Sequence, residues 1–241
     1  MTQTFKEHQD YYQHQFSTDR DLVYNNKERY QVIFDLIDEY ARPSTEAVLD
    51  VGAGRGTISS YLSQSGVDVL SVDIVGNDNL LQYESELERL SVTLGRLPDL
   101  PVGTDEFDLV VCSEVLEHLP RPVQKPAVRE LSRVAAPGGR VILSTPNPRS
   151  IHELTRPSRD GQYVENWIKP DDLGEFVSSH FEIVERLGSY YLPGPVTMLV
   201  YNVPGLSKLR ELSESIRESG RLSTWGLYQY YVLEPRTESE R

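Results

Sequence analysis

Short apolar segments alternate with helical segments along the first two thirds of the chain, and this alternation restricts the fold more than any other feature. The apolar segments are 47–51, 67–73, 107–113 and 139–146. Their nearly continuous apolar character is typical of strands that are buried on both faces. Helical segments separate them, among them 58–66, 79–90 and 129–136. Strands and helices that alternate in this way predict a doubly wound α/β fold with a parallel sheet.

The flanking segments extend this pattern on both sides. Tyr30, Ile33 and Ile37 recur at helical spacing before the first strand, and Pro43 closes that helix. After residue 146 the sequence predicts, in order, a polar loop, a helix, a strand, an inserted helix and a final alternating strand. Their ranges are 147–162, 170–180, 181–191, 206–219 and 227–235.

The composition excludes several classes of protein. Thirty-seven acidic against 24 basic residues give a formal charge of -13, which repels nucleic acid. The single cysteine, Cys112, cannot form an intramolecular disulfide or a cysteine-based zinc site. The polar N-terminus lacks the apolar core of a signal peptide, so a cytoplasmic location is predicted. Five lysines against 19 arginines, with the acidic excess, resemble proteins of salt-loving archaea, although a GC-rich genome gives a similar ratio.

A glycine-rich turn follows the first predicted strand. Gly52, Gly54 and Gly56 stand at alternate positions after Asp50, whereas a dinucleotide-binding turn has the spacing G-x-G-x-x-G. Without side chains, the turn lets a ligand approach the backbone and the helix N-terminus. Asp73 ends the next strand, where a carboxylate can accept both hydroxyls of a ribose. The pattern favours an adenosine ligand that carries no pyrophosphate.

Four ordered motifs between residues 46 and 148 resemble the class I S-adenosylmethionine-dependent methyltransferases: DVGAGRG, SVD, FDLVVCSEVLEHL and PGGRVILSTPNP. The resemblance implies a Rossmann-like sheet of seven strands, the last antiparallel, with helices on both faces. It also implies one domain over 1–241, made of cap helices (1–45), a cofactor-binding core (46–148) and substrate-side elements (149–241). A Rossmann-like fold that binds a nicotinamide cofactor is the alternative.

The same resemblance assigns the cofactor-binding residues. Gly52, Ala53 and Gly54 line the methionine part, Asp50 orders that loop or contacts the amino group, and Asp73 holds the ribose. Gly56 completes the turn, and Cys112 and Ser113 flank the cofactor. Many relatives have an acidic residue that contacts adenine where this chain has Arg96, so adenine recognition is expected near Leu97 or Asp99.

Glu114, Glu117 and His118 form the pattern E-x-x-E-H at a predicted helix start, where offsets of three and four place them together. Two carboxylates and an imidazole can hold magnesium. This pattern resembles the quinone-biosynthesis O-methyltransferases and the small-RNA terminal 2'-O-methyltransferases. Residues 164–173 also resemble the quinone group, but Gln162 and Tyr163 stand before them where a histidine is expected. Without a metal, the acidic residues stabilise the helix start. His118 is then the candidate general base and His152 the second choice.

The resemblance leaves the acceptor open. We expect O-methylation of a sugar or another small molecule, including a hexuronic acid of a lipid-linked surface glycan. A quinone-type O-methyltransferase and a non-catalytic cofactor-binding subunit are the alternatives. The segments 149–166 and 188–225 are expected to determine the substrate, and Tyr11, Tyr12 and Phe16 to fold over the cofactor.

One uncharged segment raises the question of a membrane. No charged residue occurs from Leu187 to Ser207, and prolines and glycines interrupt this stretch too often for a spanning helix. It predicts a strand end and a folded lid over the substrate, or a surface that contacts lipid or a lipid-linked substrate.

Overall fold

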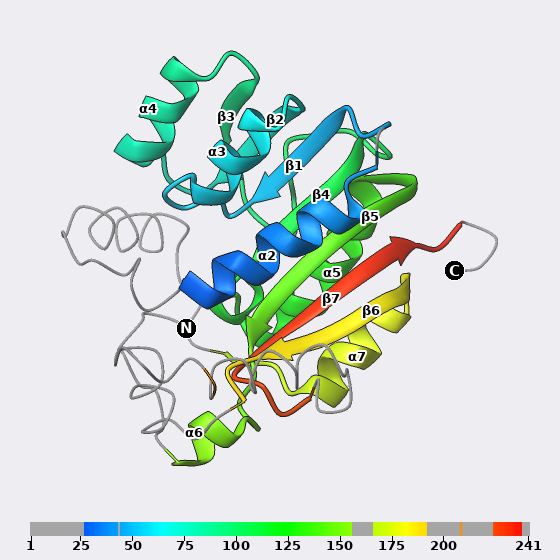
Figure 1. Ribbon diagram of the computed structural model, residues 1–241. Helices are drawn as coiled ribbons and strands as arrows, with labels where there is room; N and C mark the ends of the chain where they lie inside the picture. Colours follow the sequence, from blue (N-terminus) through cyan, green and yellow to red (C-terminus); the bar gives the residue numbers. More distant parts are fainter. Residues whose placement is uncertain (1–26, 43, 156–165, 192–207, 209–223, 238–241) are drawn as a thin grey trace.

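The computed structural model describes residues 27–42, 44–155, 166–191, 208 and 224–237. Figure 1 shows one sheet of seven strands in the order β3-β2-β1-β4-β5-β7-β6. The strands are β1 (Ala47–Val51), β2 (Asp68–Asp73), β3 (Leu90–Leu94), β4 (Phe107–Ser113), β5 (Ala135–Pro146), β6 (Phe181–Ser189) and β7 (Tyr228–Pro235). The helices are α2 (Lys27–Tyr40), α3 (Thr57–Gln64), α4 (Asp78–Glu86), η2 (Leu116–His118), α5 (Arg121–Val134), α6 (Ile151–Thr155) and α7 (Pro170–Ser178).

The strand pairing confirms the predicted topology. Strand β1 lies between β2 and β4 and is parallel to both, and β5 continues the parallel part beyond β4. Strand β7 is antiparallel to both β5 and β6. The carboxyl ends of β1 to β5 therefore meet at one edge of the sheet, and β7 begins at that same edge. Ligands bind at this edge in open α/β sheets.

Each face of the sheet has its own hydrophobic core because successive strand residues point to opposite faces. Val48, Val111 and Ile142 pack with residues of α2 and α3 on one face. Leu49, Cys112 and Leu143 pack with residues of α5 and α7 on the other. Figure 1 shows the same arrangement, with α2 in front of the sheet and α5 behind it. Helices thus cover both faces, as predicted.

Four local predictions were wrong. The E-x-x-E-H segment does not begin an α-helix: Glu114 has a left-handed backbone with φ of 59°, the short 3₁₀ helix η2 follows, and α5 begins only at Arg121. Helix α6 lies inside the predicted loop 147–162. Ala135 begins β5 instead of extending the helix before it. Leu90 begins β3, because α4 already ends at Glu86.

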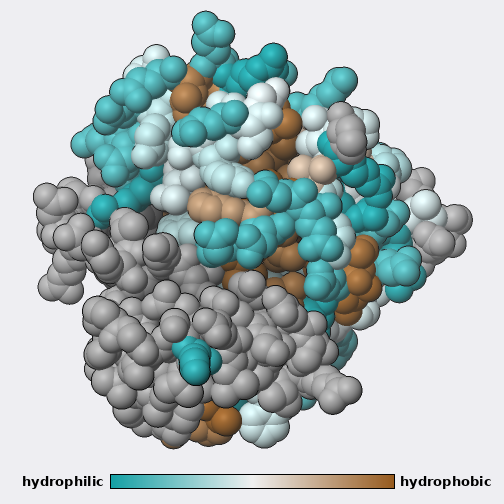
Figure 2. Space-filling view, in the orientation of Figure 1, coloured by the Kyte–Doolittle hydropathy of each residue, from teal (hydrophilic) through white to brown (hydrophobic). Residues whose placement is uncertain are grey.

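Several predictions concern residues that the structure does not describe. They include the N-terminal aromatic residues Tyr11, Tyr12 and Phe16, the segment 156–165, and, apart from residue 208, the segment 192–223, which contains the predicted inserted helix. Within the described ranges, no helix has the length and apolar character of a membrane span. Hydrophilic residues predominate on the upper part of the face in Figure 2, in line with the acidic composition.

Candidate functional site

The glycine turn after β1 has the backbone that its sequence requires. Gly52, Gly54 and Gly56 have φ of 73°, 54° and 78°, a region that side chains disfavour. The Gly52 N–H donates to the carbonyl oxygen of Val72 at 2.7 Å, which ties the turn to β2. A side chain on Gly52 would overlap Val115. The turn therefore packs directly against the segment that follows β4.

Asp73 connects the end of β2 to this turn. One carboxylate oxygen accepts a hydrogen bond from the Gly54 N–H at 2.8 Å, and the other accepts one from the Val75 N–H at 3.0 Å. The Ile74 N–H adds a third backbone hydrogen bond, so about one of the roughly four acceptor positions of a carboxylate is left for a ribose hydroxyl. Burial raises the pKa of Asp73, and the backbone hydrogen bonds oppose that rise. Asp73 thus lies where the adenosine prediction placed it, beside the glycine turn.

Asp50 is fully buried beneath the turn. Its carboxylate accepts a hydrogen bond from the Ser59 hydroxyl at 2.5 Å, and the Ser71 hydroxyl donates in turn to the Ser59 oxygen at 2.8 Å. Burial raises the pKa of Asp50 to about 7, the Ser59 bond opposes the rise, and the nearby Asp73 charge adds to it. These contacts support the role of ordering the turn and the start of α3.

The raised pKa predicts a pH-dependent stability that Asp50→Asn should remove. Between about pH 4 and pH 7 the native state holds a proton on Asp50 that the unfolded chain has lost. The native state then binds more protons, so the free energy of unfolding falls as the pH rises through this window. We expect the variant to gain on the order of a few kcal/mol relative to wild type between pH 4.5 and pH 8, in urea unfolding. Parallel pH profiles would contradict this, and the exposed Asp68→Asn is the control.

Glu114 follows β4 in a strained conformation. Left-handed backbone at a residue other than glycine is uncommon and concentrates at functional sites. One carboxylate oxygen accepts a hydrogen bond from the Ser144 hydroxyl at 2.9 Å, and the other lies 3.8 Å from Arg29 Nη1. Burial raises the pKa of Glu114 to about 8, the charge of Glu117 adds to the rise, and Arg29 opposes it.

Glu117 and His118 form a second polar pair in this segment. The buried Glu117 accepts a hydrogen bond from the Thr145 hydroxyl at 2.9 Å, and its other oxygen lies 3.9 Å from His118 Nε2. Asn166 holds the segment from outside, because its backbone N–H donates to the Glu117 carbonyl oxygen and its side chain to that of Leu119. The His118 side chain is 19% exposed, so a substrate can reach it.

The predicted magnesium site is not formed by these residues. Glu114 is directed toward Ser144 and Arg29, whereas Glu117 is directed toward Thr145. No group of three His, Cys, Asp or Glu side chains in the described part of the chain has an arrangement that could hold a metal ion. The physical reason is that the segment adopts a left-handed turn and a 3₁₀ helix, so the α-helical offsets of three and four do not apply.

Arg29 on α2 is a site residue that the sequence reasoning missed. Its guanidinium lies 4.7 Å from the ring centroid of Tyr30 and 5.8 Å from that of Tyr228. Its Nε is buried and has no hydrogen-bond partner among the residues that the structure describes. A buried donor without a partner is costly, and the Glu114 carboxylate, 3.8 Å from Nη1, is the anion that faces this guanidinium. The sequence signal that could have found it is the helical spacing, because Arg29 lies on the same face of α2 as the buried Ile33 and Leu36.

The remaining predicted residues lie at the same edge with different exposure. The Ala53 and Gly56 N–H groups donate within the turn region, to Val72 and to Ala53. The Ser113 hydroxyl lies 2.9 Å from that of Ser144. The Cys112 side chain is fully buried in the core, so its thiol does not face a ligand.

The adenine-side residues and the second base were also predicted. Leu97 is buried, and Arg96 and Asp99 form an isolated antiparallel bridge in the loop after β3. His152 lies on α6, and the structure does not describe its side chain.

Comparison with known proteins matches residues 24–181 to the family model for a methyltransferase domain. The ubiquinone biosynthesis O-methyltransferase of Nitrosospira multiformis is 32% identical over 178 residues, which cover 65% of this chain and 71% of that protein. A protein of Pyrococcus horikoshii has a similar structure, with a TM-score of 0.62, 15% identity and coverage of 92% and 93% of the two chains. The 1,6-didemethyltoxoflavin-N1-methyltransferase of Burkholderia thailandensis, solved with S-adenosylhomocysteine, gives a TM-score of 0.61, 17% identity and coverage of 98% and 92%.

Proposed function

Because the chain belongs to the methyltransferase-domain family and is an S-adenosylmethionine-dependent methyltransferase, we propose that it methylates an oxygen atom of a small-molecule acceptor, as quinone-type O-methyltransferases do. One observation carries the proposal. The glycine turn held by Asp73 and the accessible His118 lie at the same edge of the sheet. The relatives that share about 30% identity are named ubiquinone biosynthesis O-methyltransferases, which supports oxygen as the methylated atom. A phenolic hydroxyl is the acceptor that we propose.

The residues present fit the cofactor. The Asp73 carboxylate lies beside the turn with an acceptor position for a ribose hydroxyl. The turn at Gly52 to Gly54 has little side-chain bulk and admits the methionine part. The buried Arg29 guanidinium matches the carboxylate of that part. When bound, S-adenosylmethionine supplies an activated methyl group on a sulfonium.

A neutral hydroxyl must lose its proton as it is methylated, and His118 is the group placed to accept it. The Glu117 carboxylate beside the imidazole stabilises the imidazolium that forms, and Thr145 holds Glu117 in that position. This arrangement resembles other histidine bases that are oriented by a buried carboxylate. Methyl transfer otherwise requires chiefly that donor and acceptor are held in line.

We expect His118→Ala to lower kcat about 100-fold with a phenolic acceptor, the lower end of the usual contribution of a general base. The affinity for cofactor should stay unchanged, because His118 is not expected to contact it. Steady-state kinetics and calorimetry measure the two quantities. His180→Ala, near the opposite edge of the sheet, is the control, and undiminished kcat in the His118 variant would remove it as the base.

Arg29→Met should weaken the binding of S-adenosylmethionine by about ten- to a hundredfold, the loss expected for hydrogen bonds to a charged group. Adenosine lacks the carboxylate, so its affinity should be equal in wild type and variant. Calorimetry with both ligands provides the measurement, and Arg89→Met, an exposed arginine on the surface, is the control. An equal loss for both ligands would show that Arg29 acts on the fold instead.

A sugar, including a hexuronic acid of a lipid-linked glycan, is the second acceptor that we propose. The uncharged sequence from Leu187 to Ser207 supports it, together with the exposed Leu154 and Trp225 near the start of β7. These apolar residues would meet a lipid carrier or a membrane surface from the cytoplasm. A carboxylate acceptor needs no base, so methyl ester formation would be insensitive to His118→Ala.

The test is transfer of a radiolabelled methyl group from S-adenosylmethionine to catechol, glucuronic acid and extracted lipid-linked sugars. Labelled catechol supports the phenolic proposal, and labelled sugar supports the second. Tight cofactor binding without transfer to any acceptor would instead favour a non-catalytic cofactor-binding subunit. Activity that requires molar salt would support the halophilic origin that the composition suggests.

A further inference from the structure

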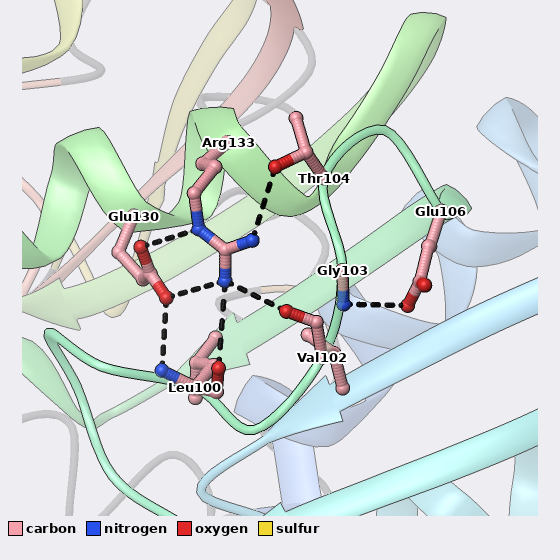
Figure 3. Close-up of polar contacts among 7 residues, drawn as sticks. All are labelled: Leu100, Val102, Gly103, Thr104, Glu106, Glu130 and Arg133. Atoms are coloured by element: carbon pink, nitrogen blue, oxygen red, sulfur yellow. Dashed lines mark hydrogen bonds and ion pairs between the residues drawn. The ribbon is translucent and has the colours of Figure 1, made fainter.

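Helix α5 carries an ion pair between Arg133 and Glu130, and both members bind the loop between β3 and β4 (Figure 3). Arg133 Nε donates to one carboxylate oxygen of Glu130 at 2.8 Å, and Arg133 Nη2 donates to the other at 2.7 Å. The same guanidinium donates to the carbonyl oxygens of Val102 and Leu100, at 3.0 and 3.4 Å, and to the Thr104 hydroxyl at 3.3 Å. Glu130 in turn accepts the Leu100 N–H at 2.8 Å. Both members of the pair therefore bind the loop.

The other end of this loop is attached to the cofactor side. The Gly95 N–H donates to the Asp73 carbonyl oxygen at 2.9 Å. Arg96 and Asp99 close a small turn, in which the Asp99 N–H donates to the Arg96 carbonyl oxygen at 3.0 Å. Residues 96–99 thus lie between Asp73, the residue expected to bind the ribose, at one end and the loop residues bound by Arg133 and Glu130 at the other.

The pair is built to hold a loop in one position. Glu130 is buried, yet its pKa is lowered, because hydrogen bonds from Arg133 and the Leu100 N–H outweigh the effect of burial. Arg133 occupies several loop acceptors at once, which requires the planar fork of a guanidinium. Bidentate pairs of this kind add geometric specificity as well as energy.

We propose that Arg133 is a positioning residue for cofactor selectivity: it holds residues 97–99 beside Asp73, where they distinguish adenine from other bases. The inference rests on the proposed binding of S-adenosylmethionine. Because β2 and β3 are parallel neighbours, the loop that leaves β3 is the element next to Asp73 on the side away from the acceptor. A base attached to the ribose therefore meets this loop, while Arg133 itself remains on α5.

The test compares two ligands by calorimetry on the full chain: S-adenosylhomocysteine and S-inosylhomocysteine, in which an oxo group replaces the adenine amino group. Wild type should prefer the adenine ligand. In Arg133→Met the Kd for S-adenosylhomocysteine should rise about tenfold, while that for the inosine ligand stays nearly constant, so the preference is lost. The kcat at saturating cofactor should be unchanged, because the acceptor side is untouched.

Arg129→Met is the matched control, since Arg129 is an exposed arginine one turn earlier on α5. Arg133→Lys keeps the positive charge but lacks the planar guanidinium, so it should lose part of the preference for the adenine ligand. This variant tests the proposal if Arg133→Met fails to fold. Preference retained in a folded Arg133 variant, or equal weakening of both ligands, would overturn the proposal. Failure of wild type to bind either ligand would instead overturn the proposed function.

Discussion

Asp73→Ala should weaken the binding of S-adenosylmethionine by about ten- to a hundredfold, because hydrogen bonds to a charged acceptor contribute about 1.5 to 3 kcal/mol. The loss has two sources in this structure. The ribose hydroxyls lose their acceptor, and the Gly54 N–H loses the partner that holds the turn. Calorimetry with the purified variant measures the change.

Two further variants separate these sources. Asp73→Asn keeps an acceptor oxygen for the Gly54 N–H but removes the charge, so its loss should be smaller than that of alanine. Asp68→Ala removes a carboxylate from the exposed start of the same strand and should leave affinity unchanged. Wild-type affinity in a folded Asp73→Ala variant would exclude Asp73 from the site.

Gly52→Val should abolish methyl transfer and lower the stability of the protein. A left-handed backbone costs about 1 to 3 kcal/mol for a residue other than glycine, and forcing a side chain into a packed contact costs about 1 to 3 kcal/mol more. The contact here is with Val115, so the new side chain would displace the segment that carries Glu117 and His118. Thermal unfolding and the transfer assay measure both effects.

Gly174→Ala is the control for this substitution. Gly174 lies on helix α7, and a side chain there would meet open space. Its replacement should leave activity intact and raise stability slightly, because alanine is the better helix former. A Gly52→Val variant with normal activity would show that the turn after β1 does not approach a ligand as closely as its backbone indicates.

The sheet and its cofactor edge could be predicted from residues that are near one another in the sequence. The signals were local. They were the apolar segments typical of buried strands, the glycines after β1 and the acidic residue that ends β2. The structure confirms the predicted strand topology and brings Asp73 and the glycine turn together, as the spacing of strand and turn indicated.

The acceptor side could not be predicted in the same way. Offsets of three and four assume an α-helix, whereas Glu114 adopts a left-handed conformation held by the backbone and hydroxyl of Ser144 on the next strand. Arg29 stands 85 positions before Glu114 in the sequence, and no local pattern connects them. The same holds for Asn166, which contacts Glu117 from a distant segment.

The sequence by itself therefore determined the order of strands and helices and the chemistry of the turn, since periodicity and glycine content act through neighbouring residues. Only the tertiary structure decided which charges meet at the sheet edge. It paired Arg29 with Glu114, and it turned the carboxylates of Glu114 and Glu117 toward Ser144 and Thr145 on β5. These pairings depend on strand crossovers and packing, which bring distant segments into contact. A pattern of residue types along the chain contains no such distances.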